Sequence, residues 1–151
     1  MTYSEELVEF VKRWEGLKLV PSPDPLVPGV ADVGYGHVLR PSDSKDPITR
    51  EQADALLRAD LDGFAAAVDE MVKPALAQHE FDALVSLAYN VGANALSAST
   101  LMRKVNANDF YGAAEEFPRW VRAGGRIVGG LVKRREAERA MFEDAIYDSS
   151  P

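Results

Sequence analysis

Two short stretches near the start of the chain decide the fold: residues 14–19 read WEGLKL and residues 31–38 read ADVGYGHV. Before them, apolar residues recur at i, i+3, i+4 and i+7 from Leu7 to Trp14, which predicts an amphipathic helix. Gly16 is a typical stop signal, so Glu15 is expected at the C-terminal end of that helix. Burial and the helix dipole there favour a protonated carboxyl, which a general acid needs. A solvated glutamate at a helix end is the alternative.

Helical periodicity disappears after Gly16. Four prolines between residues 21 and 28 indicate a stiff loop, and the weak alternation around it indicates a small antiparallel sheet. Two further carboxylates, Asp24 and Asp32, lie in this region. Gly34 and Gly36 permit a bulge or a close approach of the backbone to another group.

The rest of the chain is predicted to be helical. Thr49 and Gln52 form a capping-box pattern that starts a helix of about 22 residues, ended before Pro74. Asp60 lies on the apolar side of this helix and needs a partner, for which His37 is the candidate. Further helices are expected over 81–91, from Ser99 or Thr100 to 105, from Asp109 to 118, and over about 131–147. In the last of these, Leu131, Ala137, Met141 and Ile146 are expected to face inward. Glycine pairs at 124–125 and 129–130 bracket a loop or short hairpin.

These elements predict a mostly helical α+β fold in one domain over residues 1–151. A small N-terminal β-sheet lobe (about 14–58) is joined by a long helix (about 49–72) to a larger helical lobe (about 74–148), which also takes in the first helix. One core accounts for the apolar stripes, so a monomer is expected.

Composition narrows the function. With 151 residues, 46% hydrophobic and 27% charged, the chain is typical of a globular protein. It has no cysteine and two widely separated histidines, so no metal site is expected. The net charge of −7 argues against nucleic-acid binding. Neither a membrane-spanning run nor a signal peptide is apparent, so neither membrane insertion nor export by a signal is expected.

Basic residues are concentrated in one segment. Residues 119–135 hold six arginines and lysines and no acidic residue. This pattern indicates either a solvated basic face or a patch that meets carboxylates of a substrate.

With these residues laid out, the chain resembles the phage-type lysozymes of glycoside hydrolase family 24, the muramidase endolysins. The family pattern is a Glu, eight residues, an Asp, five residues, a Thr, and a Gly-x-Gly-His turn. Glu15, Asp24 and the turn at 34–37 match it. The lambdoid subgroup is matched further by LAYNVG at 87–92, STLMRKVN at 99–106, EFPRW at 116–120 and GLVKRREAER at 130–139. Two departures stand out: Asp32 occupies the usual Thr position, and seven residues rather than five separate it from Asp24.

The resemblance implies a lysozyme-like fold and hydrolysis of peptidoglycan between N-acetylmuramic acid and N-acetylglucosamine, without a cofactor. It assigns Glu15 as general acid, with Asp24 and Asp32 expected to hold the attacking water and invert the anomeric configuration. An aspartate at the Thr position leaves open a nucleophilic role with retention. A phage enzyme of this kind would lie in the host cytoplasm and reach the wall after another protein permeabilises the membrane.

The resemblance also suggests residues that bind the substrate. Tyr89, Asn90, Thr100 and Val38 match positions that line the cleft, although Tyr89 could equally be a core aromatic, and Trp120 is assigned to the core. Arg134 is expected near Glu15, where its charge would favour the ionised carboxyl and so oppose the effects of burial and the helix dipole. A solvated pair with Glu138 is the alternative. Two competing functions remain: a catalytically silent wall-binding domain of the same fold, and a lytic transglycosylase that uses Glu15 alone.

Overall fold

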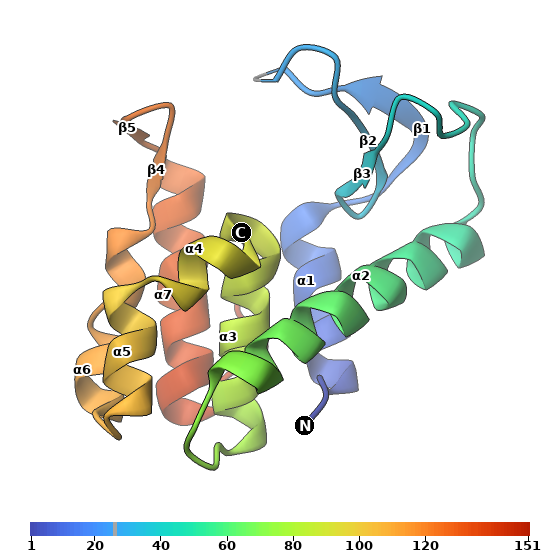
Figure 1. The fold of residues 1–151 in the computed structure, drawn as a ribbon. Helices are drawn as coiled ribbons and strands as arrows, with labels where there is room; N and C mark the ends of the chain where they lie inside the picture. Colours follow the sequence, from blue (N-terminus) through green and yellow to red (C-terminus); the bar gives the residue numbers. More distant parts are fainter. Residues whose placement is uncertain (26) are drawn as a thin grey trace.

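The protein is described by a computed structural model that covers residues 1–25 and 27–151. It is an α+β structure dominated by helices (Figure 1). In chain order the described elements are α1 (Glu5–Glu15), β1 (Lys18–Pro23), β2 (Ala31–Gly34), β3 (His37–Leu39), α2 (Arg50–Met71), α3 (Gln78–Val91), α4 (Ala93–Ser97), α5 (Thr100–Asn106), α6 (Phe110–Ala114), the 3-10 helix η1 (Phe117–Arg119), β4 (Arg122–Ala123), β5 (Arg126–Ile127) and α7 (Gly129–Asp144).

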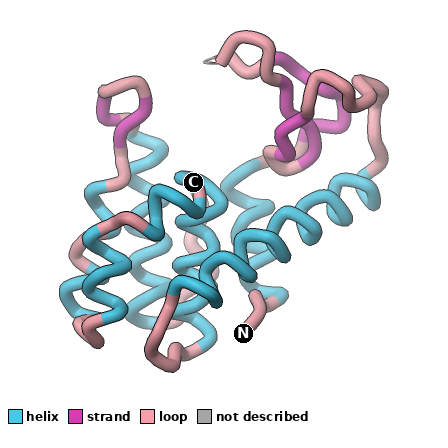
Figure 2. Tube along the Cα trace, in the orientation of Figure 1, coloured by secondary structure: helices cyan, strands magenta, loops and turns pink. Residues whose placement is uncertain are grey.

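The predicted small sheet is present as three antiparallel strands in the order β1-β2-β3. Asp32 in the central strand lies opposite Ser22 of β1 and Val38 of β3. Lys18 lies opposite Gly34, and the pairing of β1 with β2 is irregular between Lys18 and Ser22. Figure 2 shows these strands at one end of the molecule, apart from the β4–β5 hairpin.

The long helix α2 connects the sheet to the helical body, as predicted. Thr49 and Gln52 form the expected reciprocal capping box, and the helix has 22 residues, a length of about 33 Å. It runs obliquely from below the sheet to the far side of the body (Figure 1). No helix in the described ranges is both long and apolar enough to cross a membrane.

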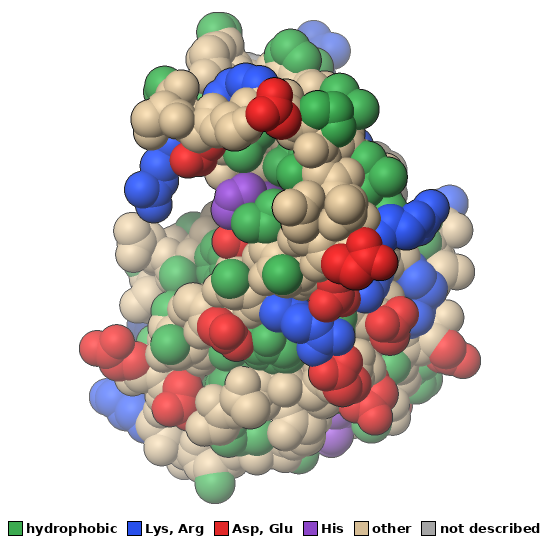
Figure 3. Space-filling model, turned by 90° about the vertical axis from the view of Figure 1, so that its right-hand side faces the viewer, with side chains coloured by type: hydrophobic (Ala, Val, Ile, Leu, Met, Phe, Trp, Pro, Cys, Tyr) green, Lys and Arg blue, Asp and Glu red, His purple; other side chains and the backbone are tan. Residues whose placement is uncertain are grey.

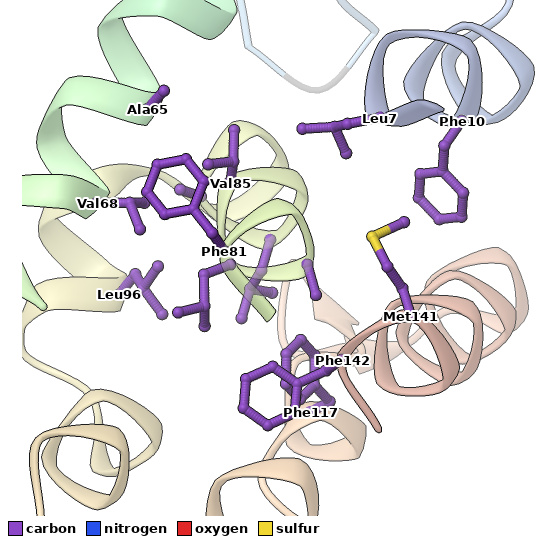
Figure 4. Packing of buried hydrophobic residues seen from close by; sticks show 14 of the residues in the cluster. Leu7, Phe10, Ala65, Val68, Phe81, Val85, Leu96, Phe117, Met141 and Phe142 are labelled. Atoms are coloured by element: carbon purple, nitrogen blue, oxygen red, sulfur yellow. The ribbon is translucent and has the colours of Figure 1, made fainter. Parts of the chain in front are cut away.

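The hydrophobic core lies in the helical body around α3, which packs against α7 and α2. Figure 4 shows side chains from several helices converging there, including Phe10 of α1, Val68 of α2 and Phe81 of α3. Trp120 packs against this core, as expected. The core fixes the end of α1 relative to α3 and α7, and these three helices supply Glu15, Tyr89 and Arg134 of the site described below.

The C-terminal part departs from the prediction in four places. Gly124 and Gly125 have φ of +59° and +78° and form the turn of the β4–β5 hairpin, one of the two forms predicted for this segment. Helix α7 begins at Gly129, two residues earlier than predicted. It ends at Asp144 because Ala145 adopts a left-handed conformation, which leaves Ile146 41% exposed rather than facing inward. Helix α6 ends at Ala114, and η1 accommodates Pro118 instead. The short helix α4 was not predicted.

Candidate active site

Glu15 is the last residue of α1, as predicted, and Gly16 caps the helix with φ of +71°. Its side chain is 19% exposed. Nη1 of Arg134, from α7, donates a hydrogen bond of 2.7 Å to Oε2 of Glu15. The expected pairing of these two residues is therefore present, and it joins the first and last helices of the protein.

Arg134 belongs to a buried group of charges on α7. Its Nε lies 3.5 Å from Oε2 of Glu138, so both predicted partners of Arg134 are contacted, but Glu138 is fully buried and the pair is not solvated. Glu138 also accepts hydrogen bonds from Ser86 (2.6 Å) and Arg135 (3.1 Å). Burial by itself lowers the pKa of Arg134, and the carboxylates of Glu138 and Glu15 outweigh it and raise that pKa. Arg134 therefore faces Glu15 as a cation.

The Gly-x-Gly-His turn lies against the other oxygen of Glu15. Gly36 has φ of +88°, and a Cβ atom placed on it would lie 3.1 Å from Oε1 of Glu15. The turn is anchored by Tyr89 of α3, whose hydroxyl donates a hydrogen bond of 2.6 Å to the carbonyl of Tyr35. Burial, followed by the charges of Glu15 and Asp60, raises the pKa of Tyr89, so this hydroxyl keeps its proton. Only a glycine fits the turn without displacing the carboxyl of Glu15.

The predicted pair between His37 and Asp60 is confirmed. Nδ1 of His37 lies 2.8 Å from Oδ2 of Asp60, which ties the end of the turn to α2. The turn is thus attached to two helices, to α3 through Tyr89 and to α2 through Asp60.

The other two candidate carboxylates lie on and beside the sheet. Asp32 accepts a hydrogen bond of 2.9 Å from Nζ of Lys18 at its Oδ1 atom. Asp24 follows β1, where its backbone N–H donates to the carbonyl of Val30 (2.7 Å) and its carboxylate accepts a bond from the N–H of Val27 (3.3 Å). The backbone pairing of β1 with the segment that precedes β2 therefore extends to Asp24.

Two pockets of about 450 Å³ each contain predicted substrate-binding residues. Val38 and Tyr89 line the first, together with Gly36, His37, Asp60 and Phe64. Asn90 lines the second, together with Trp120, Arg122 and Arg135. The surface is hollowed between the sheet lobe and the helical body in the space-filling view (Figure 3).

Thr100 does not join these groups. It is the exposed first residue of α5, and its hydroxyl accepts a hydrogen bond from Arg103 of the same helix. Within the described residues, no group of three or more His, Asp or Glu side chains is arranged to hold a metal ion.

Lys18 and Ser22 were not predicted as neighbours of Asp32. Their even spacing on a strand indicates that they share one face, but it does not identify the residue of the neighbouring strand that they meet. The predicted basic segment is also divided. Arg134 and Arg135 are buried, whereas Arg119, Arg122, Arg126 and Lys133 are exposed.

The residues that form this arrangement fall within a match to a known family. The family model described as phage lysozyme matches residues 12–138, which include Glu15, the turn and Arg134. The chain belongs to the phage lysozyme family.

Relatives of this family resemble the chain in sequence and in fold. The chain is 41% identical over 142 residues to the endolysin of Bacillus phage B103. The match covers 94% of this chain and 54% of that protein, so the chain spans about half the length of that relative. Among solved structures, the muramidase domain of SpmX from Asticaccaulis excentricus has a TM-score of 0.85 and 35% identity, covering 94% of this chain and 97% of that one. A point mutant of P22 lysozyme has a TM-score of 0.81 and 33% identity, covering 94% and 98%. The lysozyme-like fold predicted from the sequence is confirmed.

Proposed function

We propose that this chain is a peptidoglycan hydrolase that cleaves the β-1,4 bond between N-acetylmuramic acid and N-acetylglucosamine, with Glu15 as the general acid. The observation that carries the proposal is the position of Glu15, held between Arg134 and the backbone of Gly36. Membership of the phage lysozyme family supports the substrate class, since the relatives named above include an endolysin and a muramidase domain.

The two oxygens of Glu15 have different surroundings. Oε2 accepts the hydrogen bond from Arg134, whereas Oε1 has no hydrogen-bond partner among the described residues and faces Gly36. In the proposed reaction the proton is carried by Oε1 and passes to the glycosidic oxygen as the bond to the anomeric carbon breaks. Arg134 keeps the carboxyl from rotating away from the substrate.

Asp24 and Asp32 are proposed to position the water that attacks the anomeric carbon from the opposite face. The water supplies its oxygen to the new reducing end and passes one proton to the aspartate that holds it. We favour inversion on the basis of the family. If the first product, followed by NMR, keeps the β configuration of the substrate, Asp32 acts as a nucleophile instead.

The substrate contacts follow from the pockets. We propose that Val38 and the ring of Tyr89 contact sugar in the first pocket, because both line it and Val38 is 61% exposed. Asn90 is proposed to contact the substrate in the second pocket. Thr100 remains a candidate from the resemblance alone.

The test compares the wild type with Glu15→Gln on purified peptidoglycan, measuring the release of soluble fragments. Glu9→Gln is the matched control, because Glu9 is an exposed glutamate of the same helix. We expect a loss of about 10²–10⁴-fold for Glu15→Gln, the usual contribution of a general acid, and less than about twofold for Glu9→Gln. If the wild type releases nothing, a silent wall-binding domain is the better description.

A further inference from the structure

The carboxylate of Asp32 is held by two side chains of the neighbouring strand. Nζ of Lys18 donates hydrogen bonds to Oδ1 of Asp32 (2.9 Å) and to the hydroxyl of Ser22 (3.1 Å). The Ser22 hydroxyl lies at a longer distance of 3.5 Å from the same Oδ1 atom. Both contacts to the carboxylate converge on this one oxygen. No donor among the described residues reaches Oδ2.

The strand register produces this cluster. Lys18 lies opposite Gly34, which has no side chain to compete for space, so the lysine can reach the diagonal neighbour Asp32. Ser22 lies directly opposite Asp32. Lys18 and Ser22 are four positions apart on β1, whereas their partners on β2 are two positions apart. This irregularity brings both side chains to the same carboxylate. On the other side, Asp32 lies opposite the apolar Val38.

The ion pair adds little to the stability of the fold. The side chain of Lys18 is 51% exposed and that of Asp32 is 28% exposed, and ion pairs in such surroundings contribute little to folding. Removal of the pair is therefore expected to leave the thermal midpoint nearly unchanged. A functional effect of Lys18 can then be separated from unfolding.

We propose that Lys18, assisted by Ser22, is a positioning residue that fixes Oδ1 of Asp32 and leaves Oδ2 as the oxygen that accepts a hydrogen bond from the attacking water. This inference rests on the proposed function, because it concerns how Asp32 works in that reaction. A threonine at position 32 would present a single oxygen and no charge. An aspartate presents two oxygens and a negative charge, and Lys18 occupies one oxygen and offsets the charge.

The test measures kcat and KM of Lys18→Ala, Lys18→Arg and the control Lys45→Ala on purified peptidoglycan. Lys45 is a lysine of the same lobe whose ammonium donates to the backbone carbonyls of Arg40 and Asp43. We expect Lys18→Ala to lower kcat about tenfold with KM within about twofold, which corresponds to about 1.4 kcal/mol. Lys18→Arg is expected to retain most of kcat, because arginine can also donate to Oδ1. Lys45→Ala is expected to match the wild type.

A second pair of variants tests whether the effect passes through Asp32. In an Asp32→Thr background, Lys18→Ala is expected to change kcat less than about twofold, because the two changes are coupled. An equal tenfold loss in both backgrounds would overturn the inference, as would an unchanged kcat of Lys18→Ala. If Asp32→Thr is itself inactive, the comparison of Lys18→Ala with Lys18→Arg decides whether a cationic donor at position 18 is needed, and equal kcat values for these two variants would overturn the inference. A wild type without activity would overturn the proposed function, and this inference with it.

Discussion

Arg134 of α7 donates a 2.7 Å hydrogen bond to the carboxyl of Glu15, the last residue of α1, so the first and last helices meet at one candidate catalytic group. The bond fixes Oε2 and leaves Oε1 beside Gly36. The position of this carboxyl thus depends on two contacts from opposite parts of the fold, and each can be changed separately.

The first prediction concerns the turn. Gly36→Ala is expected to lower peptidoglycan release at least about tenfold, because the new methyl group would lie 3.1 Å from Oε1 of Glu15. It should also destabilise the fold by about 1–2 kcal/mol, the cost of a left-handed conformation for a residue with a side chain. Gly124→Ala is the control, since Gly124 also has a positive φ, +59°, but nothing lies within 4 Å of its added methyl group. Equal activities of the two variants would show that the contact with Glu15 is unimportant.

The second prediction concerns the bond that anchors the turn. Tyr89→Phe leaves the carbonyl of Tyr35 without its donor, so we expect a loss of about 1–3 kcal/mol in the free energy of unfolding and a lower kcat. Tyr111→Phe is the control, because Tyr111 is 75% exposed. Urea denaturation and fragment release measure the two effects. A Tyr89→Phe protein as stable and active as the control would contradict this role.

The same residue predicts a dependence on alkaline pH. Burial raises the pKa of Tyr89 in the folded protein, so above about pH 10 the unfolded chain loses this proton before the folded protein does. The stabilisation is therefore complete below about pH 10 and is lost as the pH rises toward the folded pKa, by at most about 1.4 kcal/mol per pH unit. Urea midpoints between about pH 9 and 12 should fall less steeply for Tyr89→Phe than for the wild type. Identical slopes for the two proteins would argue against a raised pKa of Tyr89 in the folded protein.

A further prediction concerns the buried charges that support Arg134. Glu138→Gln leaves Arg135, which is fully buried, without its paired carboxylate. Removing one partner of a buried ion pair costs about 3–5 kcal/mol, so we expect a loss of this size in urea denaturation. Glu136→Gln, an exposed change on the same helix, should stay within about 0.5 kcal/mol of the wild type. A similar small effect for Glu138→Gln would mean that the cluster is not a structural requirement.

Local signals in the sequence predicted much of the fold and part of the site. The cap at Thr49 and the end of α1 at Gly16 follow from rules that act over one helix. The pair His37–Asp60 follows from the position of Asp60 on the apolar side of its helix, and the pair Glu15–Arg134 follows from the family resemblance. Capping depends on neighbouring residues only, so such features can be read without tertiary structure.

Three features could not be predicted in this way. The glycine pairs at 124–125 and 129–130 look alike in the sequence, but the first forms a hairpin turn and the second begins α7. Charged residues are rarely buried, so the alternative partner of Arg134, Glu138, is expected to be solvated, whereas it is fully buried. The contact between Lys18 and Asp32 depends on the irregular register of β1, which is set by the whole sheet.

The most direct test of hydrolysis at the proposed bond is digestion of purified peptidoglycan in H₂¹⁸O, followed by mass spectrometry of the fragments. Each cut consumes one water molecule, so the account predicts fragments that end in reducing N-acetylmuramic acid and carry one ¹⁸O atom per cut. The rate at which these fragments form should fall about 10²–10⁴-fold with Glu15→Gln. Unlabelled 1,6-anhydro ends would identify a lytic transglycosylase, and label on reducing N-acetylglucosamine would show that a different bond is cut; either result would contradict the account.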